Sequence, residues 1–422
     1  MHHPASRPVS GRLAVIRGLW EMNDSNEPQK PISTDFESLT ADNPARSLRS
    51  QMQPALPSPE EMVAHMDRHI IGHGAAKKML AVACYDHLMQ CAAAELMGGK
   101  VWPDNHSVIA GPSGCGKSAM IEVLGDFLGV PVVQIDCSNL TPSGYKGRNL
   151  SQIFDDLEER LVDGDQTRPA LVVWEEIDKL ASCGGEAGRY REMSQADALR
   201  FLDGAMCGEG KSLDSSRILS LGCGVFAGLD RIRDPDSIAR IGFPIVAGGR
   251  GNLTSRRQAE PLQPEHLEQF GLMTEFVGRF SRFALLDAID RGVMRRIITD
   301  SESSVLTRKV IQFRLHGVRL VFDDSAIDAV AEMAIAHSTG ARGLRMILGR
   351  VLWEWEFQLP CLSESGVTEI CFDGRAVRGE GAPVIRRATE RNVRESLVEA
   401  RRRAGSYPGK LMTEGGDDLS IF

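Results

Sequence analysis

The residues most clearly able to do chemistry form a glycine-rich segment that ends in lysine and serine. The segment matches G-x-x-x-x-G-K-[ST] in full, with an apolar run before it and an amphipathic stretch after it. It consists of Gly111, Pro112, Ser113, Gly114, Cys115, Gly116, Lys117 and Ser118. Glycines let backbone N–H groups turn inward around phosphates, and a helix N-terminus adds positive potential. The pattern predicts a phosphate-binding loop in which Lys117 reaches the β- and γ-phosphates and Ser118 holds Mg²⁺.

Two adjacent acids follow a second apolar run. Residues 171–174 are all apolar, and Glu175 and Glu176 come directly after them. An apolar strand that delivers two acids to its C-terminal end is typical of the second half of a P-loop NTPase site. We expect Glu175 to support the metal and Glu176 to orient and activate the attacking water. The alternatives are a chance glycine-rich turn and a solvated acidic turn, and the matching context of both motifs disfavours them.

Alternating strand and helix patterns surround these motifs. The strand patterns cover residues 107–110, 131–135, 170–174 and 218–221, and the helix patterns cover residues 75–97, 116–128, 149–161 and 195–206. Such alternation predicts a mainly parallel sheet with helices on both faces. An earlier helix is expected to begin at Ser58, which can cap it, with Pro59 at its first position and Glu61 completing a capping box.

The chain divides by pattern into four parts. Residues 1–57 are rich in Pro, Ser, Asp and Asn and predict a disordered arm. A large α/β domain is expected over residues 58–284, with a Gly-, Arg- and Pro-rich loop insertion at residues 230–263. Residues 285–387 are mostly helical in pattern and predict a smaller domain, and residues 388–422 form a tail.

Composition limits the possible partners and location. Of the 422 residues, 42% are hydrophobic and 25% charged, as in ordinary globular proteins. The net charge of −8 argues against nucleic acid as the main partner. Nine scattered cysteines without a CxxC pair predict reduced thiols rather than disulfides or a zinc site. No apolar run approaches the roughly 18 residues of a membrane span, so we expect no membrane partner and a cytoplasmic location.

Beyond these two motifs, several blocks resemble the ClpX family of AAA+ proteins. The segment Glu-Glu-Ile-Asp-Lys-Leu at residues 175–180 resembles the family's Walker B motif, and Ile70 and Ile71 resemble the isoleucine pair that packs on adenine. Further matching blocks are residues 140–147 (the aromatic pore loop), 225–229 (the segment after the next strand), 271–279 (the arginine finger) and 339–345 (sensor 2). They run in family order from about residue 60 to 350. HslU, a relative, shares several blocks, but the last two fit ClpX better.

The resemblance implies an α/β AAA+ P-loop NTPase domain with a parallel sheet, a smaller mostly helical AAA+ lid domain, and ATP and Mg²⁺ as cofactors. It also implies that Arg279 reaches into the neighbouring subunit's site and that Arg342 senses the γ-phosphate from the small domain. An arginine that acts across subunits requires an oligomer, and the family forms homohexameric rings. The alternative for each arginine is a surface salt bridge.

Two further segments carry expectations about protein partners. Tyr145 resembles the pore residue that pushes an extended polypeptide, and its neighbours Gly144 and Gly147 favour an exposed loop over a buried core tyrosine. In the insertion, Ile241, Gly242 and Phe243 resemble the tripeptide with which ClpX-type unfoldases dock on the ClpP peptidase. The alternative for this tripeptide is an ordinary loop anchor. The expected partners are therefore unfolded or tagged proteins and a ClpP-like peptidase.

The sequence departs from the family at four places. No cysteine precedes Cys84, so the family's N-terminal zinc-binding domain is not expected. Glu175 stands where the family has Asp, residues 207–217 lack its basic Arg-Lys-His loop, and no sensor 1 residue is evident near Cys223. The resulting hypothesis is an ATP-dependent unfoldase that delivers proteins to a peptidase. A stand-alone remodelling chaperone and a weakly hydrolysing ATP-binding scaffold remain alternatives, and a DNA-acting motor is disfavoured by the acidic charge.

Overall fold

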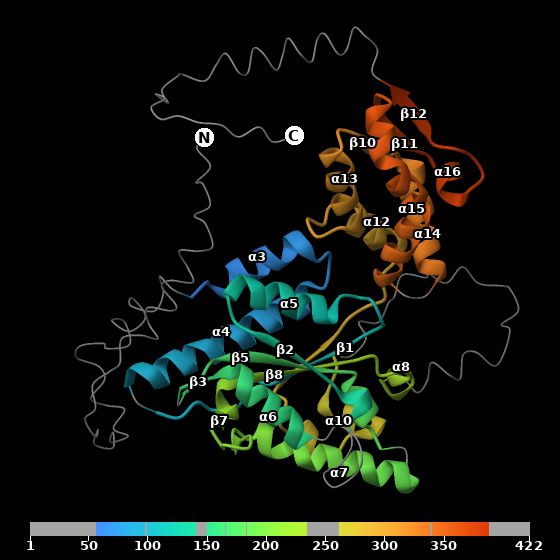
Figure 1. The fold of residues 1–422 in the computed structure, drawn as a ribbon. Coiled ribbons are helices and arrows are strands. Elements are labelled where there is room, and N and C mark those ends of the chain that lie inside the picture. Colours follow the sequence, from blue (N-terminus) through green and yellow to red (C-terminus); the bar gives the residue numbers. More distant parts are fainter. Residues whose placement is uncertain are drawn as a thin grey trace, which may run out of the picture. The chain divides into compact units, whose positions relative to one another are not determined.

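A computed structural model of the chain describes residues 56–97, 99–140, 150–164, 166–182, 184–233, 261–337 and 340–387 (Figure 1). The described residues form two units. The first contains residues 56–304 with 334–344, and the second contains residues 305–333 with 345–387. The expectations for the N-terminal arm, Tyr145, the tripeptide at residues 241–243 and the C-terminal tail lie outside the described residues.

A five-stranded parallel sheet forms the centre of the first unit. Its strand order is β2-β5-β8-β1-β9, and every neighbouring pair is parallel. The strands are β1 (Ser107–Ala110), β2 (Val132–Asp136), β5 (Ala170–Glu175), β8 (Ile218–Gly224) and β9 (Arg282–Leu285). All residues of β1 and β8 are buried, as expected for parallel strands that are covered on both faces. This sheet confirms the predicted α/β fold class.

Helices cover both faces of this sheet, and the side chains of β5 show how. Ala170, Val172 and Trp174 belong to one buried apolar cluster, whereas Leu171 and Val173 belong to another. Because successive strand residues point to opposite faces, the two clusters are the two cores of a three-layer domain. One core includes side chains of α3 (Pro59–His69), α4 (Gly74–Met97) and α5 (Lys117–Leu128). The other includes side chains of α6 (Leu150–Leu161), α7 (Gly185–Leu202), α8 (Leu229–Arg233), α10 (Pro264–Phe270) and α11 (Thr274–Val277).

Short elements complete the first unit. They are η2 (Cys137–Asn139), η3 (Ile177–Leu180), η4 (Ser215–Arg217), α12 (Arg291–Thr299) and two small antiparallel pairs, β3 (Val162–Asp163) with β4 (Gln166–Thr167) and β6 (Met206–Cys207) with β7 (Leu213–Asp214). Of these, η3 follows β5 directly and η2 follows β2 directly. Both therefore lie at the C-terminal ends of their strands, where the acidic motif was predicted.

The predicted start of α3 is confirmed in detail. The Ser58 hydroxyl accepts the N–H of Glu61 at 3.2 Å, and the Glu61 carboxylate accepts the N–H of Ser58 at 2.9 Å. Helix α7 differs from the predicted helix at residues 195–206, because it begins at Gly185 and ends at Leu202. Its first turns are mostly exposed and lack an apolar period, and it ends where Gly204 takes a left-handed φ of 76°.

The second unit combines helices with a three-stranded sheet. The strands β10 (Arg319–Phe322) and β11 (Val367–Phe372) are parallel, and β12 (Val384–Arg387) pairs antiparallel with β11. Its helices are α13 (Val305–Leu315), α14 (Asp324–Ala336), α15 (Arg342–Glu364) and α16 (Gly374–Arg378), although the ends of α14 and α15 nearest residues 334–344 group with the first unit. Lys309 of α13 pairs with Glu356 of α15 at 2.6 Å. Neither β10 nor β12 was predicted from the sequence.

Candidate functional site

The glycine-rich segment forms the turn between strand β1 and helix α5, as its pattern predicts. Gly114 and Gly116 have φ values of 71° and 103°, which L side chains rarely adopt. Gly116 is the N-cap of α5 and gives the helix no side-chain cap. The first N–H groups of α5 are therefore available to an anion, and the helix N-terminus adds positive potential there.

The Lys117 ammonium lies within this turn. Its Nζ donates to the carbonyl oxygen of Gly111 at 2.6 Å and to that of Pro112 at 2.9 Å. The side chain thus folds back over the loop that precedes it. An ammonium beside the uncapped N-terminus of a helix is suited to binding the charged phosphates of a nucleotide.

The two predicted acids lie at the same edge of the sheet as this turn. Glu175 is the last residue of β5, and it pairs in register with Cys223 of β8, which itself pairs with Ile109 of β1. The electrostatics of Cys223 agree with this placement. Burial and then the Glu175 carboxylate raise the pKa of its thiol, whereas the Lys117 ammonium lowers it. Glu175 and Lys117 are therefore both near one buried thiol.

Glu176 has an unusual backbone. It is exposed, and it takes a left-handed conformation with φ 53° and ψ 39° at the start of η3. Such a conformation in a residue other than glycine costs about 1–3 kcal/mol and often occurs at functional sites. It turns the chain sharply between β5 and η3.

The structure also brings the predicted adenine-side residues to the loop. Ile70 caps the C-terminus of α3, and its Cγ2 lies 3.8 Å from the position that a Cβ on Gly116 would take. Ile71 is buried, with 6% of its surface exposed. The isoleucine pair therefore neighbours the predicted phosphate site.

The sensor 2 segment reaches the loop as well. The N–H of Ala341 donates to the Gly114 carbonyl at 3.0 Å. Arg342 comes next, at the start of α15, and its side chain is exposed. Burial raises the pKa of the Cys115 thiol, and Arg342 is among the cations that oppose this rise. Arg342 thus lies close to the phosphate loop in the same unit.

Arg279 is not brought to this site. Strand β9 follows it, and Arg282, the first residue of β9, pairs with Ser107, the first residue of β1. The phosphate loop follows the other end of β1, roughly 10 Å further along the strand. Arg279 instead forms a two-point ion pair with Asp203, whose second contact is 3.2 Å from Nη2 to Oδ2. Arg279 is therefore at the opposite edge of the sheet from its own loop.

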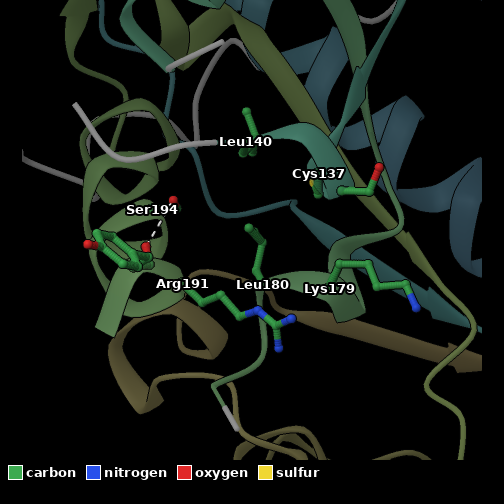
Figure 2. Close-up of a pocket in the computed structure, with 8 residues that line it drawn as sticks. Cys137, Leu140, Lys179, Leu180, Arg191 and Ser194 are labelled. Atoms are coloured by element: carbon green, nitrogen blue, oxygen red, sulfur yellow. Dashed lines mark hydrogen bonds between the residues drawn. The ribbon is translucent and has the colours of Figure 1, made fainter. Parts of the chain in front are cut away.

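A separate small pocket lies between η2, η3 and α7. Its volume is about 160 Å³. Figure 2 shows Leu140 and Leu180 approaching it from opposite sides, with Cys137 and Ser194 on the remaining walls. None of the phosphate-loop residues lines it, so the pocket is distinct from the site described above.

Two buried polar residues to which the sequence analysis gave no role hold the acidic turn in place. The Gln195 amide donates to the Leu180 carbonyl at 2.8 Å and accepts the N–H of Met273 at 2.7 Å. The Asp178 carboxylate accepts the N–H of Val225 at 3.1 Å, which ties η3 to the turn after β8. Asp178 stood in a recognised motif, but nothing in the pattern around Gln195 marked it as buried.

Two other features are absent from the residues that the structure describes. There, no three His, Cys, Asp or Glu side chains are grouped so that they could hold a metal ion. No described helix combines the length and apolar character needed to cross a bilayer.

Comparisons with known proteins agree with this geometry. Residues 107–213 match the model of the AAA family, the ATPase family associated with various cellular activities. ClpX 3 of Methylococcus capsulatus, an ATP-dependent Clp protease ATP-binding subunit, is 32% identical over 371 residues, which cover 79% of this chain and 83% of that protein. The chain belongs to the ClpX family. The ClpX proteins of Azotobacter vinelandii (32% identity, 75% of this chain and 77% of that protein) and Borrelia duttonii (30%, 72% and 75%) are also similar.

Family membership confirms three of the sequence-based expectations. The resemblance to ClpX is confirmed, the fold is that of an AAA+ protein, and this ClpX-family chain is a nucleotide-binding ATPase. The roles of individual site residues remain predictions, and so do Mg²⁺, the ring and the docking tripeptide.

Proposed function

We propose that this ClpX-family ATPase is a protein unfoldase that works as a homohexameric ring and delivers substrates to a ClpP-like peptidase. One observation supports the assembly of the chain into a ring. The phosphate loop and the acids lie at one edge of the sheet, whereas Arg279 lies at the other. An arginine in that position can serve a nucleotide only if the nucleotide belongs to a second copy of the chain.

The residues at the C-terminal edge of the sheet have complementary roles in hydrolysis. The N–H groups at the start of α5 bind the phosphates, and Lys117 neutralises charge on the β- and γ-phosphates. Glu176 accepts a proton from the water whose oxygen attacks the γ-phosphorus, while the bond from that phosphorus to the bridging oxygen of ADP breaks. Glu176 suits this role because it is exposed and leaves the strand through a sharp turn.

The donor set at this edge fits Mg²⁺. Ser118 offers a hydroxyl and Glu175 a half-buried carboxylate, both oxygen donors of the kind that Mg²⁺ prefers. Mg²⁺ in nucleotide sites commonly takes only one or two protein ligands and completes its shell with water and phosphate oxygens. A pair of protein ligands is therefore sufficient. These two side chains would hold the ion, which would neutralise charge on the phosphates.

Two arginines complete the proposed site from different directions. Arg279 leaves Asp203 and contacts the γ-phosphate of the neighbouring subunit, where it stabilises the charge that develops during transfer. Arg342 contacts the γ-phosphate in its own chain from the start of α15. Arg342 is the first residue of α15, a helix that continues into the second unit. Loss of the γ-phosphate would therefore remove a contact at the start of that helix.

The surface of the second unit supports assembly. Trp353 and Phe357 of α15 are 63% and 83% exposed, and Met346 on the same helix is 52% exposed. Their spacings of seven and four residues place all three on one face of the helix. Large apolar residues gathered on one face usually mark a protein–protein contact. Replacing Trp353 with Glu should lower the solution mass from that of a hexamer, as measured by light scattering.

The proposed peptidase partner rests on the names of the relatives and on the sequence. The similar proteins are named ATP-dependent Clp protease ATP-binding subunits. The tripeptide of Ile241, Gly242 and Phe243 would dock on the peptidase, and Tyr145 would grip the substrate in the channel. Burying Ile241 and Phe243 in apolar pockets would each contribute about 1.5–3 kcal/mol before ordering costs, and six weak contacts around a ring would add through multivalency.

The central experiment measures steady-state ATP hydrolysis with and without an unfolded protein and ClpP, together with degradation of that protein. We expect the unfolded protein to stimulate hydrolysis and to be degraded only when ClpP is present. A pull-down on ClpP with wild type and Phe243→Ala tests the docking: wild type should bind and the variant should not. A wild type that unfolds proteins without binding ClpP would instead indicate a stand-alone chaperone.

One observation favours a second function, a nucleotide-binding scaffold that barely hydrolyses ATP. Glu175 is one methylene longer than the Asp of the family pattern, and Mg²⁺ demands near-ideal octahedral geometry. If wild type hydrolyses ATP no faster than the Glu176→Gln variant while both bind it, the scaffold is correct and the unfoldase proposal fails.

A further inference from the structure

The carbonyl oxygens of the phosphate loop are held by donors from outside the loop. The His73 imidazole lies beside the loop, with its Nε2 3.1 Å from the carbonyl oxygen of Cys115. The Ala341 N–H holds the preceding carbonyl, that of Gly114, from another direction. Two consecutive carbonyls of the loop are therefore tied to two segments far apart in the sequence.

The Cys115 contact has a consequence for the next residue. In a planar trans peptide, the C=O and the N–H point in opposite directions. With the Cys115 oxygen turned toward His73, the Gly116 N–H must point away from His73. No acceptor within the described residues takes this N–H. Gly116 is also the N-cap of α5, so its N–H joins the other donors at the start of that helix.

The backbone around His73 is built to hold the imidazole in this place. His73 takes a left-handed φ of 57°, which is uncommon outside glycine, and Gly72 before it has a φ of 81°. The His73 carbonyl accepts the N–H of Lys77 at 3.0 Å in the first turn of α4. The Lys77 side chain is wholly buried, and its ammonium donates to the carbonyl of Ile70 and, at 2.6 Å, to Asp67. The turn from α3 to α4 is thus fixed from both sides.

The protonation of His73 suits a donor to a carbonyl. Burial lowers the pKa of the imidazole, and Lys77 lowers it further, while the bond to Cys115 and the charge of Asp287 oppose the change. The ring is therefore neutral near pH 7. A neutral ring next to a carbonyl oxygen must carry its proton on Nε2, because only that tautomer can donate there.

We propose that His73 is a positioning residue for nucleotide binding, which holds the Cys115 carbonyl outward so that the Gly116 N–H faces the phosphates. The inference rests on the proposed nucleotide site at Lys117. It adds that the phosphate loop and the adenine-side turn are coupled by one hydrogen bond. Because His73 acts on the phosphate side, its loss should weaken all nucleoside diphosphates alike and leave the discrimination between bases to Ile70 and Ile71.

Three substitutions test this inference in the full-length protein. His73→Asn keeps a residue that tolerates the left-handed conformation, but its amide nitrogen corresponds to Nδ1 and cannot reach Cys115. His73→Gln carries an amide N–H at about the reach of Nε2 and should restore the bond. His316→Asn makes the same chemical change at an exposed histidine of the second unit and serves as the matched control.

The measurements are the Kd values of ADP and GDP by displacement of a fluorescent nucleotide, with kcat and KM for ATP. We expect His73→Asn to weaken ADP and GDP by the same factor of about ten, as for one well-placed hydrogen bond. KM should rise while kcat changes less than about twofold, because the bond serves ground state and transition state equally. The Kd values of His73→Gln should stay within about threefold of those of wild type. The Kd values of His316→Asn should equal those of wild type.

Several outcomes would overturn the inference. ADP binding by His73→Asn within about twofold of wild type would do so, and so would His73→Gln binding as weakly as His73→Asn. A changed ratio of ADP to GDP affinity would place the role of His73 at the base instead. Lys117→Ala tests the nucleotide site separately from the role of His73: if this variant binds ADP as wild type does, the proposed nucleotide site itself is wrong. Thermal melting of each variant shows whether a loss reflects folding.

Discussion

The two edges of the central sheet differ in what they hold and in how firmly they hold it. At the C-terminal edge, the phosphate loop is fixed by Lys117, His73 and Ala341, all through hydrogen bonds to its backbone carbonyls. At the N-terminal edge, Arg279 is tied to one half-exposed carboxylate, that of Asp203. The first edge is a preorganised site, whereas the second presents a cation in a weak contact.

The difference in strength suits the two proposed roles, nucleotide binding by the phosphate loop and movement of Arg279 to a neighbouring subunit. Surface ion pairs typically contribute about 0.2–1 kcal/mol, because solvent screens them and holding two long side chains costs entropy. Moving Arg279 from Asp203 to a phosphate of a neighbouring subunit therefore costs little. Distorting the phosphate loop would cost more, since several hydrogen bonds, most of them partly buried, would be lost together. One edge is built to bind, and the other is built to change partners.

Replacing Arg279 with Ala should have the largest effect on hydrolysis. We expect kcat to fall by about 10³-fold or more, because an arginine finger commonly contributes 10³–10⁵ to phosphoryl transfer. ADP binding should remain, since Arg279 lies at the far edge from the phosphate loop of its own chain. Steady-state hydrolysis and fluorescent-nucleotide binding measure the two quantities.

Mixing variants would test whether Arg279 acts across subunits. Arg279→Ala retains Glu176, and Glu176→Gln retains Arg279, so each is inactive alone. In rings mixed at equal ratio, about a quarter of the interfaces would combine an intact Glu176 with a neighbouring Arg279. Partial recovery of hydrolysis would support action in trans. Absence of recovery in rings shown to be mixed would assign Arg279 to its salt bridge with Asp203.

Replacing Glu176 with Gln probes the preorganised edge. The change removes the proton acceptor but keeps the shape of the side chain, so kcat should fall by about 10²–10⁴-fold while ATP binding is kept. The left-handed turn at Glu176 is a backbone feature, and thermal stability should therefore change little. If hydrolysis survives this substitution, the water is activated by another group.

Much of the preorganised edge could be predicted from the sequence, because its motifs are local. The glycine pattern at residues 111–118 specifies a turn between a strand and a helix, and the structure has that turn. The placement of Arg279 relative to Asp203 depends on how α11 packs beside the end of α7, which no local pattern records. Residues that act through long-range hydrogen bonds, such as Gln195 and His73, were missed for the same reason.

The limits of some helices and strands could not be predicted from the sequence either. Helix α7 begins ten residues before its predicted start. Its first turns bury only Gly188 and Ser194 and show no apolar period, so the sequence pattern did not reveal them. Strand β9 carries only four residues, and it completes the sheet by pairing with β1. Short edge strands gain their conformation from the neighbouring strand rather than from their own sequence.

Replacing Glu175 with Asp should have a moderate effect at the preorganised edge. Removing one methylene restores the shorter acid of the family pattern, and we expect kcat to rise about two- to fivefold in Mg²⁺ as the metal geometry improves. Measuring kcat over a range of Mg²⁺ concentrations tests this rise, with Glu175→Gln as the control that removes the charge. A fall in kcat for Glu175→Asp would show that the surrounding residues have adapted to the longer side chain.

Replacing Asp203 with Asn should have the smallest effect, and it directly tests the ion pair at the N-terminal edge. The substitution keeps the volume of the side chain but removes the charge that holds Arg279, so the guanidinium is freer to move. If Asp203 competes with the neighbour's phosphate, kcat/KM for ATP should rise, by less than about fivefold, since the competing pair contributes about 1 kcal/mol at most. The effect should shrink at high salt, where exposed charges are screened. A decrease in kcat/KM at unchanged thermal stability would mean that Asp203 orients Arg279 for catalysis, and the two edges would then both be preorganised.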